Sequence, residues 1–248
     1  MTPKVELRNV VKSFEGKVVL RDVDLSVGVH EVVCLIGSSG SGKSTLLKCV
    51  NLLVAVDGGD ILLDGVAITD PAVNPNDVRQ KMGIVFQAFN LFPHMSVLDN
   101  ITLSPIKVHG VDKEEARGQA AELLEQFGLI DKINEYPDRL SGGEQQRVAV
   151  IRALATRPDL MLFDEVTSAL DPELVAEVLS VIRGLKDQGM TMIIATHEMG
   201  FARDVADQVC FLDDGVILEK SEPQDLFSNP QQPRTRQFLQ RITDAGRL

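Results

Sequence analysis

The stretch Gly37-Ser38-Ser39-Gly40-Ser41-Gly42-Lys43-Ser44 has the spacing G-x-x-x-x-G-K-[ST] of a phosphate-binding loop. The apolar run Glu31–Ile36 before it predicts a buried strand, and the residues from about Lys43 onward predict a helix. Glycines let the backbone turn its N–H groups and the helix N-terminus toward an anion. We expect Lys43 to reach the β- and γ-phosphates of a nucleotide, Ser44 to bind Mg²⁺ and Thr45 to lie near the α-phosphate.

A second apolar run, Leu160–Phe163, ends in two acidic residues, Asp164 and Glu165. A carboxylate at the carboxyl end of a strand beside a phosphate loop is well placed to hold Mg²⁺, so Asp164 is the candidate ligand. Glu165 is the candidate group that polarises an attacking water molecule. Acidic residues after a strand alone usually form a solvated turn, and the phosphate loop is what favours the functional interpretation.

The sequence LSGGEQ, residues 140–145, predicts a helix that Ser141 caps with Glu144 as the capping-box partner. Gly142 and Gly143 occupy the first helical positions, where they lower helix stability and leave backbone N–H groups accessible. The chain therefore carries two candidate phosphate-binding helix N-termini but one candidate Mg²⁺ site. This combination suggests that two copies of the chain share each nucleotide.

The remaining pattern predicts an α/β fold. β-Branched runs at 5–11 and 17–27 indicate a hairpin, and later strands alternate with helices. Between about 95 and 157 the pattern is helical, and Asp112 begins one helix that Gly128 ends. We therefore expect a mostly parallel sheet, interrupted by a helical insertion of roughly sixty residues.

Composition narrows the class of protein. The chain has 248 residues, 44% of them hydrophobic, and a formal net charge of −11, which disfavours nucleic acid as a partner. Cys34, Cys49 and Cys210 are widely spaced, which indicates buried thiols and not a disulfide framework or a zinc site. No apolar stretch approaches the length of a membrane span and no secretion signal is evident, so we expect a cytoplasmic protein that contacts a membrane through another protein.

Together these motifs resemble the nucleotide-binding subunits of ABC transporters. The phosphate loop (37–45), LSGGEQ (140–145), LMLFDE (160–165), SALD (168–171) and the pair Thr196-His197 occur in that family's order. The resemblance covers essentially the whole chain and implies a P-loop NTPase fold of the ABC type, with an antiparallel β edge. It implies one domain over 1–248, with a RecA-like core at about 1–87 and 158–248 and a helical subdomain at about 88–157. It also implies a head-to-tail homodimer in which Ser141, Gly142 and Gly143 complete the partner's ATP site.

The resemblance assigns further roles to single residues. Gln87 matches the glutamine that contacts the metal and faces the membrane subunits, and His197 matches the residue that contacts the γ-phosphate. Asp171 matches the acidic residue of the loop between subunits, and its position before Pro172 also predicts a helix cap. Phe14 takes the place of the aromatic residue that stacks on adenine, with a core position as the alternative.

Three residues depart from the family pattern. Val166 and Ser38 stand where proline is usual or frequent, and His30 stands where a turn glycine is usual. None of them removes a catalytic group, so they bear on the rigidity of the loops and not on the chemistry.

Two kinds of ABC protein fit these motifs: a transporter subunit, and a soluble ABC ATPase of DNA repair or translation. The second is disfavoured by the acidic charge, the single cassette and the absence of sustained heptads. The segments FQAFNLFPHMSVLDNI (86–101) and FSNPQQPRTRQFLQRI (227–242) resemble the polar amino-acid uptake branch of bacterial importers. That branch implies ATP and Mg²⁺ as cofactors, two integral-membrane permease subunits and, indirectly, an extracytoplasmic solute-binding protein. We expect peripheral attachment at the cytoplasmic face of the inner membrane, with the permease contacted through the helical insertion and the apolar stretch Phe89–Met95, for which a buried loop is the alternative.

Overall fold

The computed structural model of the chain describes residues 2–244. Its centre is a six-stranded sheet with the strand order β10-β9-β3-β8-β7-β6. The parallel strands are β3 (Val32–Ile36), β6 (Met82–Val85), β7 (Leu160–Asp164), β8 (Met192–Ala195) and β9 (Gln208–Asp213). The last strand, β10 (Val216–Ser221), pairs with β9 antiparallel. The expected mostly parallel sheet is confirmed, and β3, β7 and β8 are buried along their whole length because both faces are covered.

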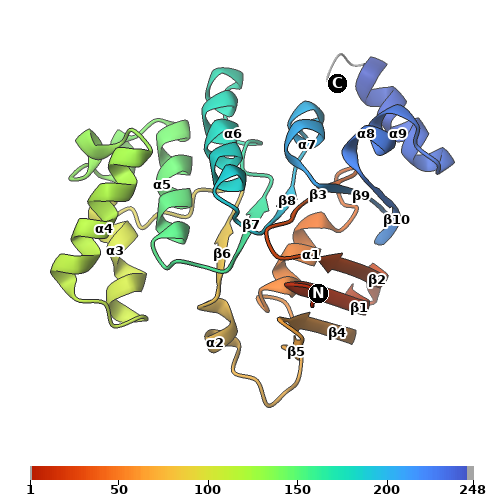
Figure 1. Cartoon of the computed structure of the whole chain (residues 1–248), viewed down its shortest axis with the longest axis horizontal. Helices are drawn as coiled ribbons and strands as arrows, with labels where there is room; N and C mark the ends of the chain where they lie inside the picture. Colours follow the sequence, from red (N-terminus) through yellow and green to blue (C-terminus); the bar gives the residue numbers. More distant parts are fainter. Residues whose placement is uncertain (1, 245–248) are drawn as a thin grey trace.

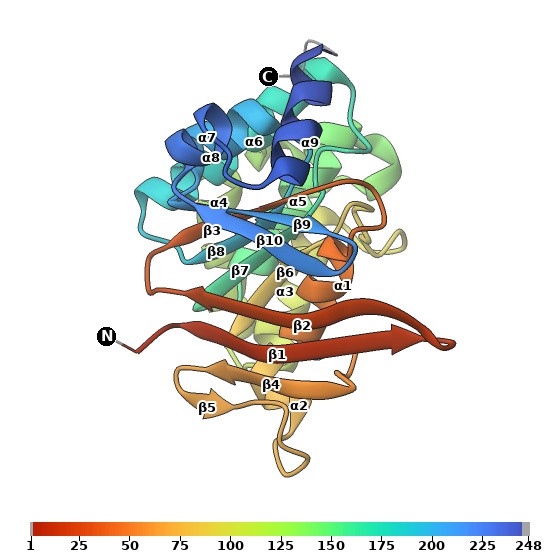
Figure 2. The ribbon, with the colours of Figure 1, turned by 90° about the vertical axis from the view of Figure 1, so that its right-hand side faces the viewer.

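A second, antiparallel sheet has the order β2-β1-β4-β5. It consists of β1 (Val5–Phe14), β2 (Lys17–Val27), β4 (Gly58–Leu63) and β5 (Val66–Ala67). The predicted hairpin is confirmed, and both of its turn residues, Glu15 and Gly16, have positive φ angles. Figure 2 shows this sheet below the central sheet, with helix α1 (Lys43–Val50) between them. Side chains of both sheets and of α1 form one buried apolar cluster, which fixes the start of α1 against two layers.

Helices cover the other face of the central sheet. They are α6 (Pro172–Asp187), α7 (Met199–Val205), α8 (Pro223–Ser228) and α9 (Pro233–Asp244). The last two helices pack on the sheet: Leu226 and Leu239 are buried, and the ring of Phe238 lies 5.0 Å from that of Phe211. The sequence pattern did not predict β10 or the short helix α2 (Pro75–Arg79).

The predicted helical region stands at one end of the molecule, drawn in green in Figure 1. It contains α3 (Val97–Lys107), α4 (Lys113–Gln126) and α5 (Gly142–Leu154). These helices have a buried cluster of their own, which includes Ile101, Leu124 and Ile151. On α5, Val148 and Ile151 belong to this cluster, whereas Ala149 and Val150 belong to the cluster between the central sheet and the helices α6 to α9. The separate cluster supports the helical subdomain that we propose for residues of about 88–157.

Two smaller expectations are confirmed. Asp112 caps α4 by accepting hydrogen bonds from the amides of Glu114 and Glu115. The three cysteines are free and buried. Within residues 2–244, none of the helices is both long enough and apolar enough to cross a membrane.

Candidate nucleotide-binding site

The predicted phosphate loop connects β3 to α1, and two of its positions admit no side chain. At Gly37, with φ of 152°, a Cβ atom would lie 2.1 Å from the carbonyl oxygen of Leu212. At Gly42, with φ of 110°, it would lie 2.9 Å from Cδ2 of Leu20. The loop is therefore pressed against β9 on one side and β2 on the other, whereas Ser38, Ser39 and Gly40 are exposed at its tip.

The groups inside the loop are hydrogen-bond donors. Lys43 is 3% exposed, and its Nζ donates to the carbonyl oxygens of Gly37 at 3.0 Å and Ser38 at 3.2 Å. The hydroxyl of Ser41 is buried and has no hydrogen-bond partner among the described residues. A buried ammonium group and a buried, unpaired hydroxyl both favour an anion. A phosphate group fits this set of donors.

A second pair of side chains fits a hard cation. The Oγ of Ser44 donates to Oδ1 of Asp164 at 2.6 Å, and Asp164 is 5% exposed. Burial raises the pKa of Asp164, against the hydrogen bond from Ser44 and the positive charges of Lys48 and Lys43. A desolvated carboxylate is stabilised by a bound cation, and Mg²⁺ binds to one or two carboxylates together with phosphate oxygens. Within residues 2–244 no three His, Cys, Asp or Glu side chains gather to hold a metal by themselves.

Glu165 lies between two basic groups. Its Oε1 is 2.9 Å from Nε2 of His197 and 3.3 Å from Nζ of Lys43. The hydrogen bond from His197, together with the charges of His197 and Lys43, lowers the pKa of Glu165 from 4.5 to about 2 against the opposing effect of burial. Glu165 is therefore ionised at neutral pH. Its φ of 50° turns the chain sharply at the end of β7 and is unusual for a residue with a side chain.

These groups come from distant parts of the sequence but from three neighbouring strands. Lys43 and Ser44 follow β3, Asp164 and Glu165 end β7, and His197 follows β8. Parallel neighbours bring their carboxyl ends to one edge of the sheet, which is where open α/β sheets bind ligands. The structure thus brings together the site that the separate motifs predicted.

Two other predicted residues lie apart from this cluster. Gln87 follows β6, the strand next to β7; it is exposed and makes no hydrogen bond to another described residue. Phe14 is 45% exposed at the end of β1, so the alternative of a core position is wrong. The Nζ of Lys12 lies 5.2 Å from the centre of the Phe14 ring. An exposed ring of this kind is available for stacking on a flat ligand. Thr45 is half-buried on α1.

The predicted cap at the start of α5 is confirmed as a complete capping box. The amide of Glu144 donates to Oγ of Ser141 at 3.3 Å, and the amide of Ser141 donates to Oε2 of Glu144 at 2.7 Å. Gly143 also allows α5 to pack closely against α6, which the sequence did not reveal. A Cβ atom at this position would lie 3.1 Å from Cβ of Leu174 on α6. Helix α5 stands apart from α1 in Figure 1, so Ser141 and Gly142 are not part of the chain's own phosphate loop.

The predicted cap at the start of α6 is wrong in its chemistry. Asp171 occupies the N-cap position, but its side chain makes no capping hydrogen bond. Pro172 has no N–H group, and the amide of Leu174 donates instead to the carbonyl oxygen of Asp171 at 2.9 Å. The carboxylate is left exposed and available to another partner.

The three residues that depart from the family pattern are each fixed by contacts with neighbouring groups. His30 has a φ of 63°, and its amide donates to Oγ1 of Thr191 while its ring bonds to the carbonyl oxygen of Gly189. Ser38 donates to Oδ1 of Asp213 at 3.3 Å. Val166 is 4% exposed and packs in the cluster between the central sheet and the helices α6 to α9. These contacts restrain the loops without glycine or proline.

The fold and the loop define a P-loop nucleotide-binding protein. A family model described as ABC transporter matches residues 20–168. The chain belongs to the ABC transporter family and is one of its ATP-binding cassettes, an ATPase, as the motifs predicted.

Relatives and solved structures agree with this assignment. The chain is 50% identical over 239 residues to the glutamine transport ATP-binding protein GlnQ of Escherichia coli (strain K12), covering 96% of this chain and 100% of GlnQ. It is 53% identical over 245 residues to the L-cystine transport system ATP-binding protein TcyN of the same strain, covering 96% and 98%. The dimeric post-hydrolysis structure of the cassette MJ0796 bound to ADP and Pi matches with a TM-score of 0.79 and 34% identity, covering 88% of this chain and 98% of that one.

Proposed function

We propose that this chain is the ATP-hydrolysing subunit of an importer that takes up a polar amino acid or a related small solute. The observation that carries the proposal is the convergence of Lys43, Ser44, Asp164, Glu165 and His197 at the edge of one sheet. The solute class is supported by two relatives, one named for glutamine and one for cystine, that match nearly the whole chain. Because their solutes differ while their identities to this chain are similar, the motor sequence leaves the solute within that class open.

Within the site, we assign binding and chemistry to different groups. Lys43 and the loop amides bind the β- and γ-phosphates, His197 contacts the γ-phosphate, and Thr45 and the exposed ring of Phe14 hold the rest of the nucleotide. Glu165, ionised through its contacts with two basic groups, takes the proton of the attacking water. Ser44, Asp164 and Gln87 hold Mg²⁺, which supplies positive charge to the phosphates when bound.

We further propose that two copies of the chain close around two ATP molecules. Ser141, Gly142 and Gly143 form a helix N-terminus, which attracts anions but lies away from the chain's own loop. Asp171 is exposed without a capping bond, as a residue of a subunit contact would be. The MJ0796 cassette forms a dimer in its post-hydrolysis state with ADP and Pi, and the same arrangement here gives both groups a role.

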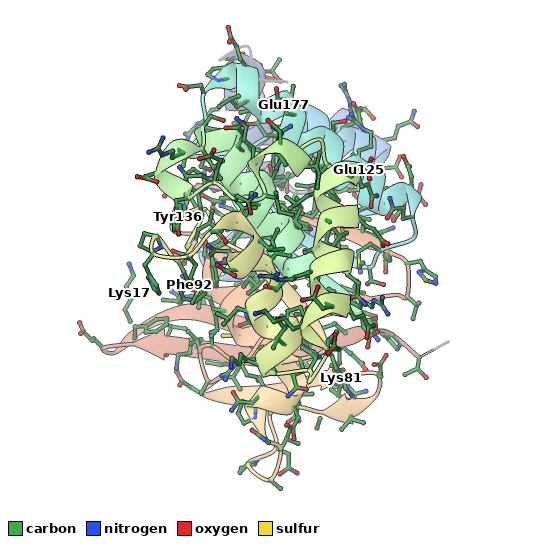
Figure 3. The ribbon with its side chains drawn as sticks, turned by 90° about the vertical axis from the view of Figure 1, so that its left-hand side faces the viewer. Lys17, Lys81, Phe92, Glu125, Tyr136 and Glu177 are labelled. Atoms are coloured by element: carbon green, nitrogen blue, oxygen red, sulfur yellow. The ribbon has the colours of Figure 1, made fainter. Side chains whose placement is uncertain are left out.

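The permease contact is proposed at the helical end. The stretch Phe89–Met95 is mixed: Leu91 packs against both helical and central clusters, whereas Phe92 is 40% exposed on the face shown in Figure 3. Beside Phe92 lies a groove of about 680 Å³, lined also by Arg79, Lys107 and Val108. A groove bordered by exposed apolar side chains suits a helix of another protein. We therefore place the chain at the cytoplasmic face of the cell membrane, bound to two permease subunits that receive solute from an extracytoplasmic binding protein.

Uptake by a reconstituted transporter tests the proposal. The chain is purified and combined in vesicles with permease subunits of an amino-acid importer from the same cell, and ATP-driven uptake of radiolabelled glutamine, arginine and cystine is measured with wild type and with Lys43→Ala. We expect uptake of at least one amino acid with wild type and loss of both hydrolysis and uptake with the variant, because Lys43 is the cation placed inside the loop. Wild-type turnover by Lys43→Ala would refute the site.

The alternative of a soluble ABC ATPase in DNA repair or translation has no relative here to favour it, since GlnQ and TcyN are both named for transport. It predicts a rate of hydrolysis that rises with DNA or ribosomes and is indifferent to the permease. Measuring the rate of hydrolysis by the same purified protein with DNA, ribosomes or the permease distinguishes the two functions.

A further inference from the structure

Helix α5 touches two parts of the proposed site that serve different nucleotides in the dimer. Ser141 caps its first turn, and two of its side chains bind the segment Phe86–Asn90, which contains Gln87. The Nε2 of Gln146 donates to the carbonyl oxygen of Phe86 at 3.2 Å. A Cβ atom at Gly142 would lie 3.6 Å from Cζ of Phe89, so the segment also reaches the first turn of the helix.

A second side chain of α5 holds the same segment further along. Arg152 donates through Nη1 to the carbonyl oxygen of Asn90 at 2.7 Å and through Nη2 to that of Phe89 at 3.3 Å. Beyond it, Asn100 of α3 accepts from the amide of Phe92 at 2.8 Å and donates to its carbonyl oxygen at 3.1 Å. The flanks of the segment are therefore fixed to two helices, and Gln87 projects between the fixed points.

Gln146 is unusual among these contacts because it is fully buried and only half satisfied. Its exposure is 0%, and its Oε1 is buried without a hydrogen-bond partner in the described chain. An unpaired buried acceptor is costly, and an apolar side chain of similar size would avoid that cost. Packing alone therefore does not explain a glutamine at this position.

We propose that Gln146 is a positioning residue that links the two ATP sites of the dimer. Its bond to Phe86 sets Gln87, at the chain's own nucleotide, relative to Ser141, at the partner's nucleotide. The unpaired Oε1 accepts a backbone N–H of the segment when the segment shifts, so the amide serves two positions of Gln87. Arg152 holds the far end of the segment in both of these positions of Gln87. This inference rests on the proposed function, because it needs Ser141 and Gln87 to act on different nucleotides.

The test replaces Gln146 with methionine, which keeps the length of the side chain and removes both hydrogen-bonding atoms. The matched control is Gln119→Met on α4, where the side chain donates only to Glu115 of the same helix. For the full chain, we measure ATP binding to the monomer, the cooperativity of hydrolysis in ATP and the Mg²⁺ concentration for half-maximal rate. Gln146→Met should leave monomer binding unchanged, lower the cooperativity and raise the Mg²⁺ requirement about three- to tenfold, as the loss of one net hydrogen bond predicts. Gln119→Met should change none of these.

A second variant keeps the test decisive if Gln146→Met does not fold. Arg152→Lys retains the charge but cannot donate to two carbonyl oxygens at once, and it should also lower the cooperativity and speed hydrogen exchange at 86–90. Cooperative hydrolysis by wild type that persists unchanged in the folded variants overturns the inference and leaves the proposed function standing. Non-cooperative hydrolysis by wild type overturns the shared-site dimer, and the inference with it.

Discussion

Replacing Glu165 with glutamine should strengthen ATP binding while it stops hydrolysis. Oε1 of Glu165 contacts both Lys43 and His197, the two groups that we assign to the γ-phosphate. The γ-phosphate must therefore compete with this carboxylate for the same donors. Glutamine keeps the shape of the side chain but lacks its charge, so the competitor is weakened.

The size of the effect follows from the pKa of Glu165. Its fall from 4.5 to about 2 corresponds to at most about 3 kcal/mol of favourable interaction. The side chain remains 17% exposed, so solvent screens part of this interaction. If about 1 kcal/mol opposes the nucleotide, the monomeric variant should bind ATP about fivefold more tightly. Hydrolysis should fall at least about 100-fold, because the proton acceptor is lost.

Calorimetric titration with ATP and with ADP, at protein concentrations that keep the chain monomeric, measures this effect. ADP lacks the γ-phosphate, so its affinity should change less than that of ATP. Glu125→Gln, at an exposed residue of α4 seen in Figure 3, controls for the loss of one charge. Equal tightening for ADP and ATP, or none for ATP, would refute the competition between Glu165 and the γ-phosphate.

Four further predictions concern other parts of the chain. Glu165→Gln with ATP should accumulate as a dimer in light scattering, and a variant that stays monomeric at high concentration would contradict the shared site. Ser141→Arg should stop hydrolysis without weakening ATP binding by the monomer, because Ser141 is exposed away from the chain's own loop; a large loss of monomer affinity would place Ser141 in its own site. Phe92→Asp should keep the basal ATPase rate and abolish uptake in vesicles with the permease, and loss of the basal rate would make Phe92 structural. Because the pKa of Glu165 is lowered, its ion pairs stabilise the fold fully above pH 4.5 and are lost as the pH falls toward 2. The difference in unfolding free energy between wild type and Glu165→Gln, measured with urea, should therefore shrink only below pH 4.5.

The gathering of the candidate site residues was predictable because it depends on residues at the ends of apolar runs. Lys43, Asp164 and His197 each follow such a run, and parallel strands bring those ends together. What the sequence concealed depends on distances between elements. The contact of Gly143 with α6 and the bond from Gln146 to Phe86 both join helices or segments whose packing has no local signature.

The prediction that Asp171 caps α6 is right for its position and wrong for the side-chain bond. Asp171 stands at the N-cap position before Pro172, but its side chain makes no capping bond, and the amide of Leu174 donates to its backbone carbonyl oxygen. The burial of Leu239 in the last helix was likewise invisible, since the helix is mostly polar and its few apolar residues pack on a sheet formed far earlier in the chain.

The interior of the described chain contains three buried clusters, and the meeting of two of them along α5 has a thermodynamic consequence. Each cluster can open as a cooperative unit of its own, and the smaller helical unit, with fewer buried side chains, should open at a lower free energy than the central sheet. Backbone amides of α3 and α4 should then exchange hydrogen together and sooner than those of β3 and β7. The helical region, which we propose contacts the permease, would then be the least stable part of the molecule. It could tilt at the boundary between the two clusters along α5 while the central sheet stays folded.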